Sequence, residues 1–363
     1  MKMTKYKLGE LVEVTRGASL SGQFYAEEGK LIRLTLGNFN MNGGGFKENT
    51  SKTDLYFTGT VRDEFILNKG DIITPLTEQS LGLLGTTARI PESGKYIQSQ
   101  DVALVRCKEG LLDPNFCYYL ISSSIVRQQL SAAAQQTKIR HTSPEKIKDC
   151  TVWVPDFEVQ KNIGRILTDI DNKIAINRRI NDNLEAMAKQ LYDYWFVQFD
   201  FPNEEGKPYK SSGGAMVWNE KLKREIPQGW SGVSLKDLAV TSRNAITPVE
   251  NEVYQHFSIP SFDACGSYSL DNGSDIKSDK FVLQEGQLLV SKLNPWFNRV
   301  VWVPRGTNMI GSTEFVVLNP NNKSESGYIY SVIKSPKFVA YCSQAATGTS
   351  HSQRRVSPDV LMA

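Results

Sequence analysis

Hydrogen-bond donors gather in two short runs, one in each half of the chain. The first run is Gln135-Gln136-Thr137-Lys138-Ile139-Arg140-His141, and the second is the polar segment 348–355, which ends in Gln353-Arg354-Arg355. Arginine, lysine, asparagine and glutamine can read base edges, while basic and hydroxyl side chains bind phosphates. Two such runs predict contact with DNA, although a solvated loop would have the same composition.

Isolated donors elsewhere extend this candidate surface. Arg16, Arg33 and Lys47 are weaker candidates individually, because a single surface cation often serves only solubility. The predicted DNA-binding set is Arg16, Arg33, Asn38, Lys47, Gln136, Lys138, Arg140, His141, Lys292, Asn298, Arg299, Ser350, Gln353, Arg354 and Arg355.

One segment could belong to an enzyme that modifies bases. Asn294-Pro295-Trp296 is similar to the Asn-Pro-Pro-aromatic motif with which amino-methyltransferases hold a flipped base. The second proline is missing, and no glycine-rich turn for S-adenosylmethionine accompanies the segment. We therefore expect a turn that presents Lys292, Asn298 and Arg299, with Trp296 packed or stacking.

Other catalytic signals are weak. Asp275-Ile276-Lys277 is a lone D-x-K tripeptide without a convincing acidic partner, so it does not predict a nuclease. The three histidines have no carboxylates at metal-binding spacing, and no P-loop is present. We predict no catalytic residue, no metal site and no cofactor in this chain.

A long helix must position these residues. Apolar side chains recur at spacings of three and four from Pro155 to Pro202, which predicts a helix with one apolar seam. About 45 residues would make a rod of roughly 65 Å. Such a rod would space two bodies and pack along a partner helix; the alternative is an amphipathic helix lying on a core. The predicted interface residues are Ile163, Leu167, Ile170, Ile174, Ile180, Leu184, Met187 and Leu191.

The segments before and after this helix share one pattern. Phe65 to Ile73 matches Phe281 to Leu289, and Ser143-Pro144-Glu145 matches Ser357-Pro358-Asp359, with further matches in the same order between them. Segments 36–60 and 259–280 do not match. A common frame with different loops suggests two modules that read different things.

Composition sets outer limits. The 363 residues are 40% hydrophobic and 22% charged, which indicates a globular chain of two or three domains. Five cysteines without a C-x-x-C pair indicate neither a disulfide framework nor a zinc site. A net charge of +3 is too small to prove a nucleic-acid partner. No stretch approaches twenty apolar residues, so we expect a cytoplasmic protein without a membrane partner.

Several of these segments together resemble the specificity (S) subunit of type I restriction-modification systems. They are Val152-Trp153-Val154-Pro155, the helix with Asp169-Ile170-Asp171-Asn172-Lys173-Ile174, Trp195 to Pro202, Gly206 to Gly214, and Ile226-Pro227-Gln228-Gly229-Trp230. Ser291-Lys292-Leu293-Asn294-Pro295 also looks like a segment of the target recognition domains of that family.

The resemblance implies two target recognition domains, each on one half of a bipartite site in double-stranded DNA. It also implies modification (M) subunits that supply the S-adenosylmethionine chemistry, and restriction (R) subunits that use ATP and Mg²⁺. The family has a second conserved helix, and the chain stops at Ala363 before one could form. We therefore expect the chain to self-associate through the central helix, with antiparallel two-fold pairing, or else to require the modification subunits to remain soluble.

The expected fold is α/β (α+β), with two tandem recognition domains that contain mixed sheets and are joined by the long helix. The expected divisions are 1–155, recognition domain 1; 156–201, helix; 202–230, irregular connector; 231–356, recognition domain 2; and 357–363, start of a distal conserved region. Two other functions stay open: a self-contained DNA methyltransferase or nuclease, and a coiled-coil adaptor that binds only protein.

Overall fold

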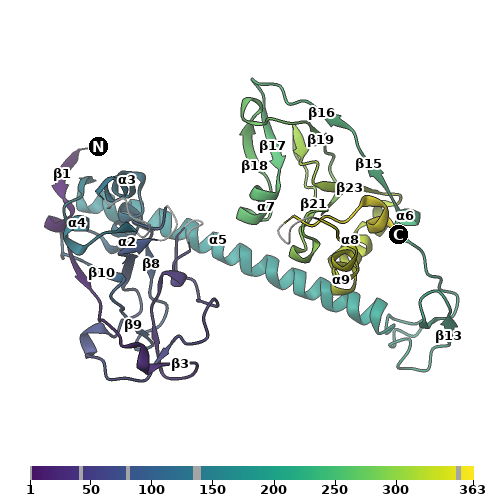
Figure 1. Ribbon diagram of the computed structural model, residues 1–363, viewed down its shortest axis with the longest axis horizontal. Coiled ribbons are helices and arrows are strands. Elements are labelled where there is room, and N and C mark those ends of the chain that lie inside the picture. The colour runs from purple at the N-terminus through teal and green to yellow at the C-terminus, as the bar shows by residue number, and fades with distance from the viewer. Residues whose placement is uncertain (1, 41–43, 79–81, 134–139, 349–352) are drawn as a thin grey trace. The chain divides into compact units, whose positions relative to one another are not determined.

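The computed structural model describes residues 2–40, 44–78, 82–133, 140–348 and 353–363. The chain divides into two compact units, Met1–Arg178 and Arg179–Ala363. The boundary falls inside one long helix, α5 (Phe157–Tyr192), which is drawn unbroken in Figure 1. Each unit combines helices with sheets, as the sequence predicted.

A four-stranded antiparallel sheet forms the centre of the first unit. In spatial order its strands are β2 (Val12–Arg16), β10 (Val102–Cys107), β6 (Ile72–Pro75) and β8 (Ala88–Arg89). Segments 71–74, 86–90 and 101–106 are rich in β-branched residues, which predicts strands from the sequence alone. They contain most of β6, all of β8 and most of β10, so these strand predictions are confirmed.

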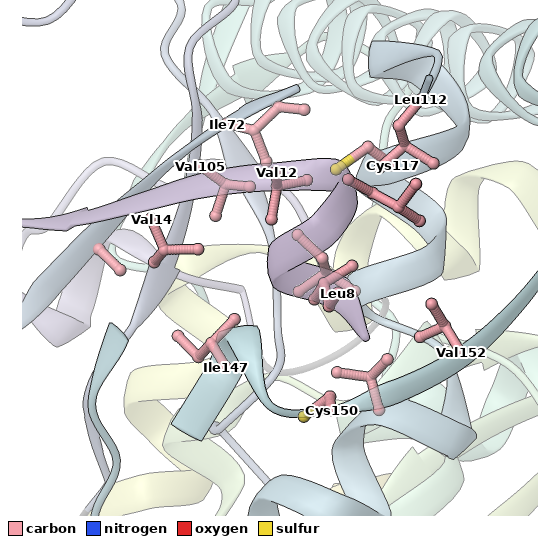
Figure 2. Packing of buried hydrophobic residues seen from close by; sticks show 14 of the residues in the cluster. Leu8, Val12, Val14, Ile72, Val105, Leu112, Cys117, Ile147, Cys150 and Val152 are labelled. Atoms are coloured by element: carbon pink, nitrogen blue, oxygen red, sulfur yellow. The ribbon is translucent and has the colours of Figure 1, made fainter. Parts of the chain in front are cut away.

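Both faces of this sheet are covered, which explains the continuous apolar run in β10. Successive side chains on a strand point to opposite faces. Ala103 and Val105 accordingly join one core, which lies under helices, while Val102 and Leu104 join a second core on the other face. Figure 2 shows Val105 within the first of these cores.

Short helices flank the sheet: α1 (Leu8–Leu11), α2 (Pro114–Ile121), α3 (Ser124–Ala133) and α4 (Pro144–Lys148). From its sequence alone we expect segment 113–130 to form a single helix, and the structure has two helices, α2 and α3, over it. The hydroxyl of Ser122 donates to the carbonyl oxygens of Tyr118 and Tyr119 where α2 ends. Such bonds compete with the backbone ladder and favour a break.

The remaining strands of the first unit form smaller sheets. One contains β3 (Tyr25–Ala26), β5 (Tyr56–Phe57), β4 (Leu31–Arg33) and β9 (Tyr96–Ile97), and the others pair β1 (Met3–Lys7) with β12 (Thr151–Pro155) and β7 (Thr77–Glu78) with β11 (Arg140–His141). β4 lies in the strand-like run 30–35, and it pairs with β9 in parallel.

The second unit repeats the central sheet with the same strand order. Its strands are β15 (Ala239–Ser242), β23 (Phe315–Pro320), β20 (Leu288–Ser291) and β21 (Val300–Trp302). The burial alternates likewise: Val316 and Leu318 join one core, while Phe315 and Val317 join another. The repeated pattern in the sequence is therefore also a repeat of the fold.

The other elements of the second unit depart from this symmetry. Its second sheet has the order β16 (Ala245–Ile246), β19 (Lys280–Val282), β22 (Met309–Gly311), β17 (Val253–Phe257) and β18 (Ser269–Asn272). Its helices are α6 (Leu235–Leu238), α7 (Ile259–Cys265), α8 (Ser326–Lys334), α9 (Pro336–Ala345) and α10 (Pro358–Met362). Helix α7 and strand β18 occupy segment 259–280, where the sequence pattern of the two copies diverged.

The long helix ends earlier than the sequence predicted. Helix α5 has 36 residues, about 54 Å of helix, and a π-helical turn, Asp193–Val197, follows it. Phe199 then has φ of 65°, in the left-handed region that a helix cannot continue through. The helix therefore stops before Phe201-Pro202, which the sequence analysis took as its end.

The connector after the helix is more regular than expected. It contains a hairpin of β13 (Met216–Asn219) and β14 (Arg224–Pro227). The ring of Phe201 stacks on Tyr209 at 4.8 Å and on Trp230 at 4.9 Å between ring centroids. The prediction of an irregular connector was wrong, because contacts between distant aromatic residues stabilise this segment.

None of the helices that the structure describes has both the length and the apolar composition needed to cross a membrane. The finer division of the chain at residues 155, 201, 230 and 356 stays a prediction.

Candidate nucleic-acid interface

One end of the central sheet gathers polar residues in the first unit. In an antiparallel sheet, the carboxyl ends of β2 and β6 and the amino end of β10 meet at the same end. The register agrees, since Arg16 pairs with Ala103 and Pro75 pairs with Val102. The Arg16 side chain is exposed there.

The segment after β6 brings Arg140 and His141 to the same end. Arg140 pairs with Glu78 and His141 with Thr77 in the β7–β11 ribbon. The amide of Thr142 donates to the Leu76 carbonyl at 2.8 Å. Arg16 and His141, which are far apart in sequence, therefore lie at the same end of the central sheet.

Glu78 organises this ribbon. Its side chain is buried, with 2% exposed, and one carboxylate oxygen accepts the amide hydrogens of Gly82, Leu83 and Leu84 at 2.9–3.1 Å. The other oxygen pairs with Nη1 of Arg140 at 3.1 Å. The Arg140 guanidinium therefore has an internal role.

The second unit repeats this arrangement. Leu293 forms a bridge with Arg355, and the Val356 amide donates to the Lys292 carbonyl at 3.0 Å. The Asn294 amide donates to the Arg354 carbonyl at 2.7 Å, and the Asn294 side-chain oxygen accepts the Arg354 amide at 3.1 Å. In both units, therefore, the same pattern of backbone hydrogen bonds joins the segment after the third strand of the sheet to the segment before the last short helix.

The register makes the two copies equivalent residue by residue. Leu76, Thr77 and Glu78 correspond to Lys292, Leu293 and Asn294, and Arg140, His141 and Thr142 correspond to Arg354, Arg355 and Val356. We call this ribbon the clasp: residues 76–78 with 140–142 in the first unit, and residues 292–294 with 354–356 in the second.

Sequence analysis missed one member of this surface. Leu8 and Leu235 are the first residues of equivalent helices. The same difference in residue number relates Arg16 to Arg243, so the two arginines occupy equivalent positions at the end of the next strand. Both arginines are exposed at the carboxyl end of the first strand of their sheets. Extending the repeat by a few residues would have found Arg243.

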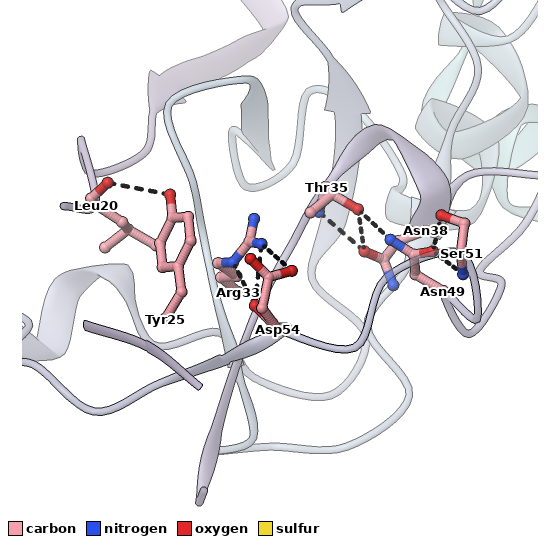
Figure 3. A network of polar contacts seen from close by, with 8 residues as sticks. All are labelled: Leu20, Tyr25, Arg33, Thr35, Asn38, Asn49, Ser51 and Asp54. Atoms are coloured by element: carbon pink, nitrogen blue, oxygen red, sulfur yellow. Dashed lines mark hydrogen bonds and ion pairs between the residues drawn. The ribbon is translucent and has the colours of Figure 1, made fainter. Parts of the chain in front are cut away.

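A cavity of about 320 Å³ opens at this sheet end in the first unit. Its polar lining includes Thr35, Asn49, Lys52 and Gln100. Figure 3 shows Asn49 between Thr35 and Ser51: its amide donates to the Thr35 hydroxyl at 2.8 Å, and its oxygen accepts from the Ser51 hydroxyl. These groups could hydrogen-bond a base edge or a phosphate.

Two predicted contact residues brace the wall of this cavity. Arg33 is 6% exposed, donates to Asp54 Oδ1 at 3.1 Å and lies over the Tyr25 ring at 3.7 Å. Asn38 is buried, accepts the Thr35 amide and donates to the Lys47 carbonyl. Both side chains are engaged within the protein.

Arg299 is likewise engaged. It is 8% exposed, and its Nε and Nη2 atoms lie 2.6 and 2.8 Å from the two oxygens of Asp263. Asn298 donates to the Lys334 carbonyl at 3.1 Å. The expected turn at Asn294-Pro295 is present, as a short 3-10 helix, but it does not expose Arg299.

The other candidates differ in accessibility. Arg355 is exposed but pairs with both oxygens of Glu314, at 3.0 Å each. Lys47, His141, Gln353 and Arg354 are exposed, and Lys292 is half-buried. Gln136, Lys138 and Ser350 lie outside the described residues.

The described residues contain no group of three or more His, Cys, Asp or Glu that could hold a metal ion. Lys277 of the D-x-K tripeptide donates to the Ser274 carbonyl at 2.7 Å.

Polar contacts attach α5 to each unit separately. In the first, Tyr119 of α2 donates to Asp171 at 2.7 Å, and burial and this bond raise the pKa of Tyr119 to about 12. In the second, Tyr330 and Lys334 of α8 donate to Glu185. Burial alone would raise the pKa of Glu185, but these two bonds outweigh it and lower the pKa.

The apolar seam of α5 is largely left uncovered within the described residues. Ile163 and Leu167 are half-buried, whereas the six residues that follow them in the predicted interface are 43–64% exposed: Ile170, Ile174, Ile180, Leu184, Met187 and Leu191.

Comparison with known proteins identifies the family. A family model of the type I restriction modification DNA specificity domain matches residues 1–186, just over half of the 363 residues. The chain belongs to this family. The specificity family was predicted from the sequence, and that prediction is confirmed.

Two curated members of the specificity family are similar to part of the chain. The MjaIX specificity subunit of Methanocaldococcus jannaschii is 25% identical over 154 residues, 42% of this chain and 33% of that protein. The HindI specificity subunit of Haemophilus influenzae is 27% identical over 107 residues, 29% of this chain and 23% of that protein. The chain thus spans a third or less of these relatives' length.

A solved structure supports the fold over the whole chain. The S subunit of a type I restriction-modification system from M. genitalium matches with a TM-score of 0.54, covering 99% of this chain and 83% of that chain. At 14% identity this likeness concerns the fold alone.

Proposed function

We propose that this member of the specificity family selects a bipartite site in double-stranded DNA, each unit reading one half. The main support for this proposal is that both units have the same strand order and the same clasp, which bring polar residues to the same end of the central sheet. The neighbouring loops differ between the units. A shared strand arrangement with loops that differ between the two units is suited to recognising two different DNA sequences.

Accessibility selects the residues proposed to contact DNA. In the first unit they are Arg16, Lys47 and His141. In the second they are the exposed Arg243, Gln353 and Arg354, together with the half-buried Lys292. Gln136, Lys138 and Ser350 stay in the proposed set on their chemistry. Exposed cations would hold phosphates, and amides would read base edges.

The remaining predicted contacts have internal partners. Arg33, Asn38, Arg140, Asn298, Arg299 and Arg355 would support the surface and touch DNA only after giving up those bonds.

Partner subunits are proposed to supply the catalytic chemistry. The exposed seam of α5 is proposed to bind the modification subunits or a second copy of the chain, since each buried leucine or isoleucine gains roughly 1.5 to 3 kcal/mol. S-adenosylmethionine chemistry would belong to the modification subunits, and ATP- and Mg²⁺-dependent cleavage to the restriction subunits.

The test is selection of DNA from a pool of randomised duplexes, with the chain alone and with the modification subunits of its own system. We expect two short preferred sequences separated by unspecified bases, and methyl transfer only when the modification subunits are present. Methylation by the chain alone would favour a self-contained enzyme. Absence of salt-dependent DNA binding in both samples would favour a protein-binding adaptor.

A further inference from the structure

The two clasps share their backbone bonds but use different side chains at one equivalent position. In the first unit this position is Glu78, and in the second it is Asn294. Both are almost fully buried, at 2% and 8% exposed. Both residues are polar and buried at equivalent positions of two otherwise divergent modules. Their hydrogen-bond partners indicate what each one does.

Each of these residues connects the first strand of its clasp with the second, at Arg140 in the first unit and at Arg354 in the second. Glu78 joins the amides of Gly82, Leu83 and Leu84 to the guanidinium of Arg140. This carboxylate holds the three amides and the guanidinium in fixed positions, because hydrogen bonds to a charged group are stronger than those between neutral groups. His141 is the next residue of the strand.

Asn294 does the same without a charge. It has φ of 48°, in the left-handed region that asparagine tolerates better than most residues. In this conformation its amide and side-chain oxygen both bond the backbone of Arg354. The exposed side chains of Gln353 and Arg354 therefore leave the sheet from a fixed point.

We infer that Glu78 and Asn294 are the positioning residues of the two modules: Glu78 holds the strand that carries Arg140 and His141, and Asn294 holds the backbone of Arg354 beside Gln353, so that each sharpens one half of the target. This inference rests on the proposed function. Neither residue is expected to touch DNA, because both side chains are buried and their polar groups face the protein.

The experiment uses the full chain with the modification subunits of its system and a pool of randomised DNA duplexes. Glu78→Gln keeps an oxygen for the amides but loses the charge that pairs with Arg140. Asn294→Ala removes the acceptor and disfavours the left-handed backbone, whereas Asn294→Asp retains both features. Thermal unfolding of each variant is measured in parallel.

We expect Glu78→Gln to lower base discrimination about tenfold in one half-site and to leave the other unchanged. Asn294→Ala should have the converse effect, and Asn294→Asp should restore discrimination. Each variant is thus the control for the other.

Three results would overturn the inference. Discrimination unchanged by Glu78→Gln and Asn294→Ala would show that neither residue positions the contacts. Equal loss in both half-sites together with a lower melting temperature would assign them a merely structural role. A wild-type chain that selects no sequence would contradict the proposed function itself, and the inference with it.

Discussion

Exposure separates the arginines that are proposed to contact DNA from those that have partners inside the protein. Arg16 and Arg243 are exposed at equivalent strand ends, whereas Arg33 and Arg299 are buried against Asp54 and Asp263. Those carboxylates lie 21 and 36 residues away in sequence. Composition finds an arginine but cannot find such a distant partner, which is why the predicted contact list mixed surface and internal residues.

The exposed pair should bind phosphates. We predict that Arg16→Ala and Arg243→Ala each weaken DNA binding for all sequences and reduce the salt slope by about one unit. Fluorescence anisotropy across a salt series would measure this. Arg106→Ala is the matched control, because Arg106 is exposed near the opposite end of β10. If Arg106→Ala weakened DNA binding equally, the overall positive charge of the protein, and not the residues at this end of the sheet, would account for the binding.

Arg299 should matter for folding. Because its guanidinium is buried and bonded to both oxygens of Asp263, Arg299→Ala should lower the free energy of unfolding by about 1 to 3 kcal/mol. Urea unfolding would measure the loss, and Arg354→Ala, at an exposed position, should change it little. Unchanged stability with a relaxed base preference would instead support the DNA contact that the sequence suggested for Arg299.

The elements of the fold differed in how far local sequence determined them. The seam of α5 predicted a long helix correctly, because a repeating apolar spacing needs no distant partner. The β13–β14 hairpin was missed, because Arg224 of β14 contacts a segment more than twenty positions away. Its guanidinium donates to the Val197 carbonyl at 2.8 Å and lies over the Phe199 ring at 4.4 Å.

Attachment of α2 to α5 should depend on pH at the alkaline end. The pKa of Tyr119 is raised to about 12, above the ordinary value of about 10, so the contact with Asp171 stabilises the protein fully below pH 10. This contribution should be lost as the pH rises from about 10 to 12. Comparing the unfolding of the wild type and Tyr119→Phe across that range checks it, since the variant lacks the titrating group. A constant difference between the two would contradict the assignment.

The seam of α5 should drive association. With Leu184 and Leu191 at 57% and 50% exposed, we predict that Leu184→Glu/Leu191→Glu abolishes self-association or binding of the modification subunits. Sedimentation of the chain alone and with those subunits would measure both. Lys173→Glu, at an exposed polar position of the same helix, serves as the control. Unchanged association in the double variant would show that the partners bind elsewhere.

At the scale of the whole molecule, the internal repeat carried most of what the sequence could predict. Matching segments predicted two modules with a common frame, and the structure has two central sheets with the same strand order. The matching residues Ser143 and Ser357 are the N-caps of the equivalent helices α4 and α10. The clasp was not foreseen, because its bonds join residues sixty or more positions apart and involve backbone groups that all sequences share.

We propose that the two units read their half-sites independently of each other. To test this, residues 233–356 are replaced with the corresponding segment of another specificity subunit, and the methylated sequence is determined in cells that carry the complete system. We predict that one half-site changes and the other is retained. A change in both half-sites, or in neither, would rule out independent reading.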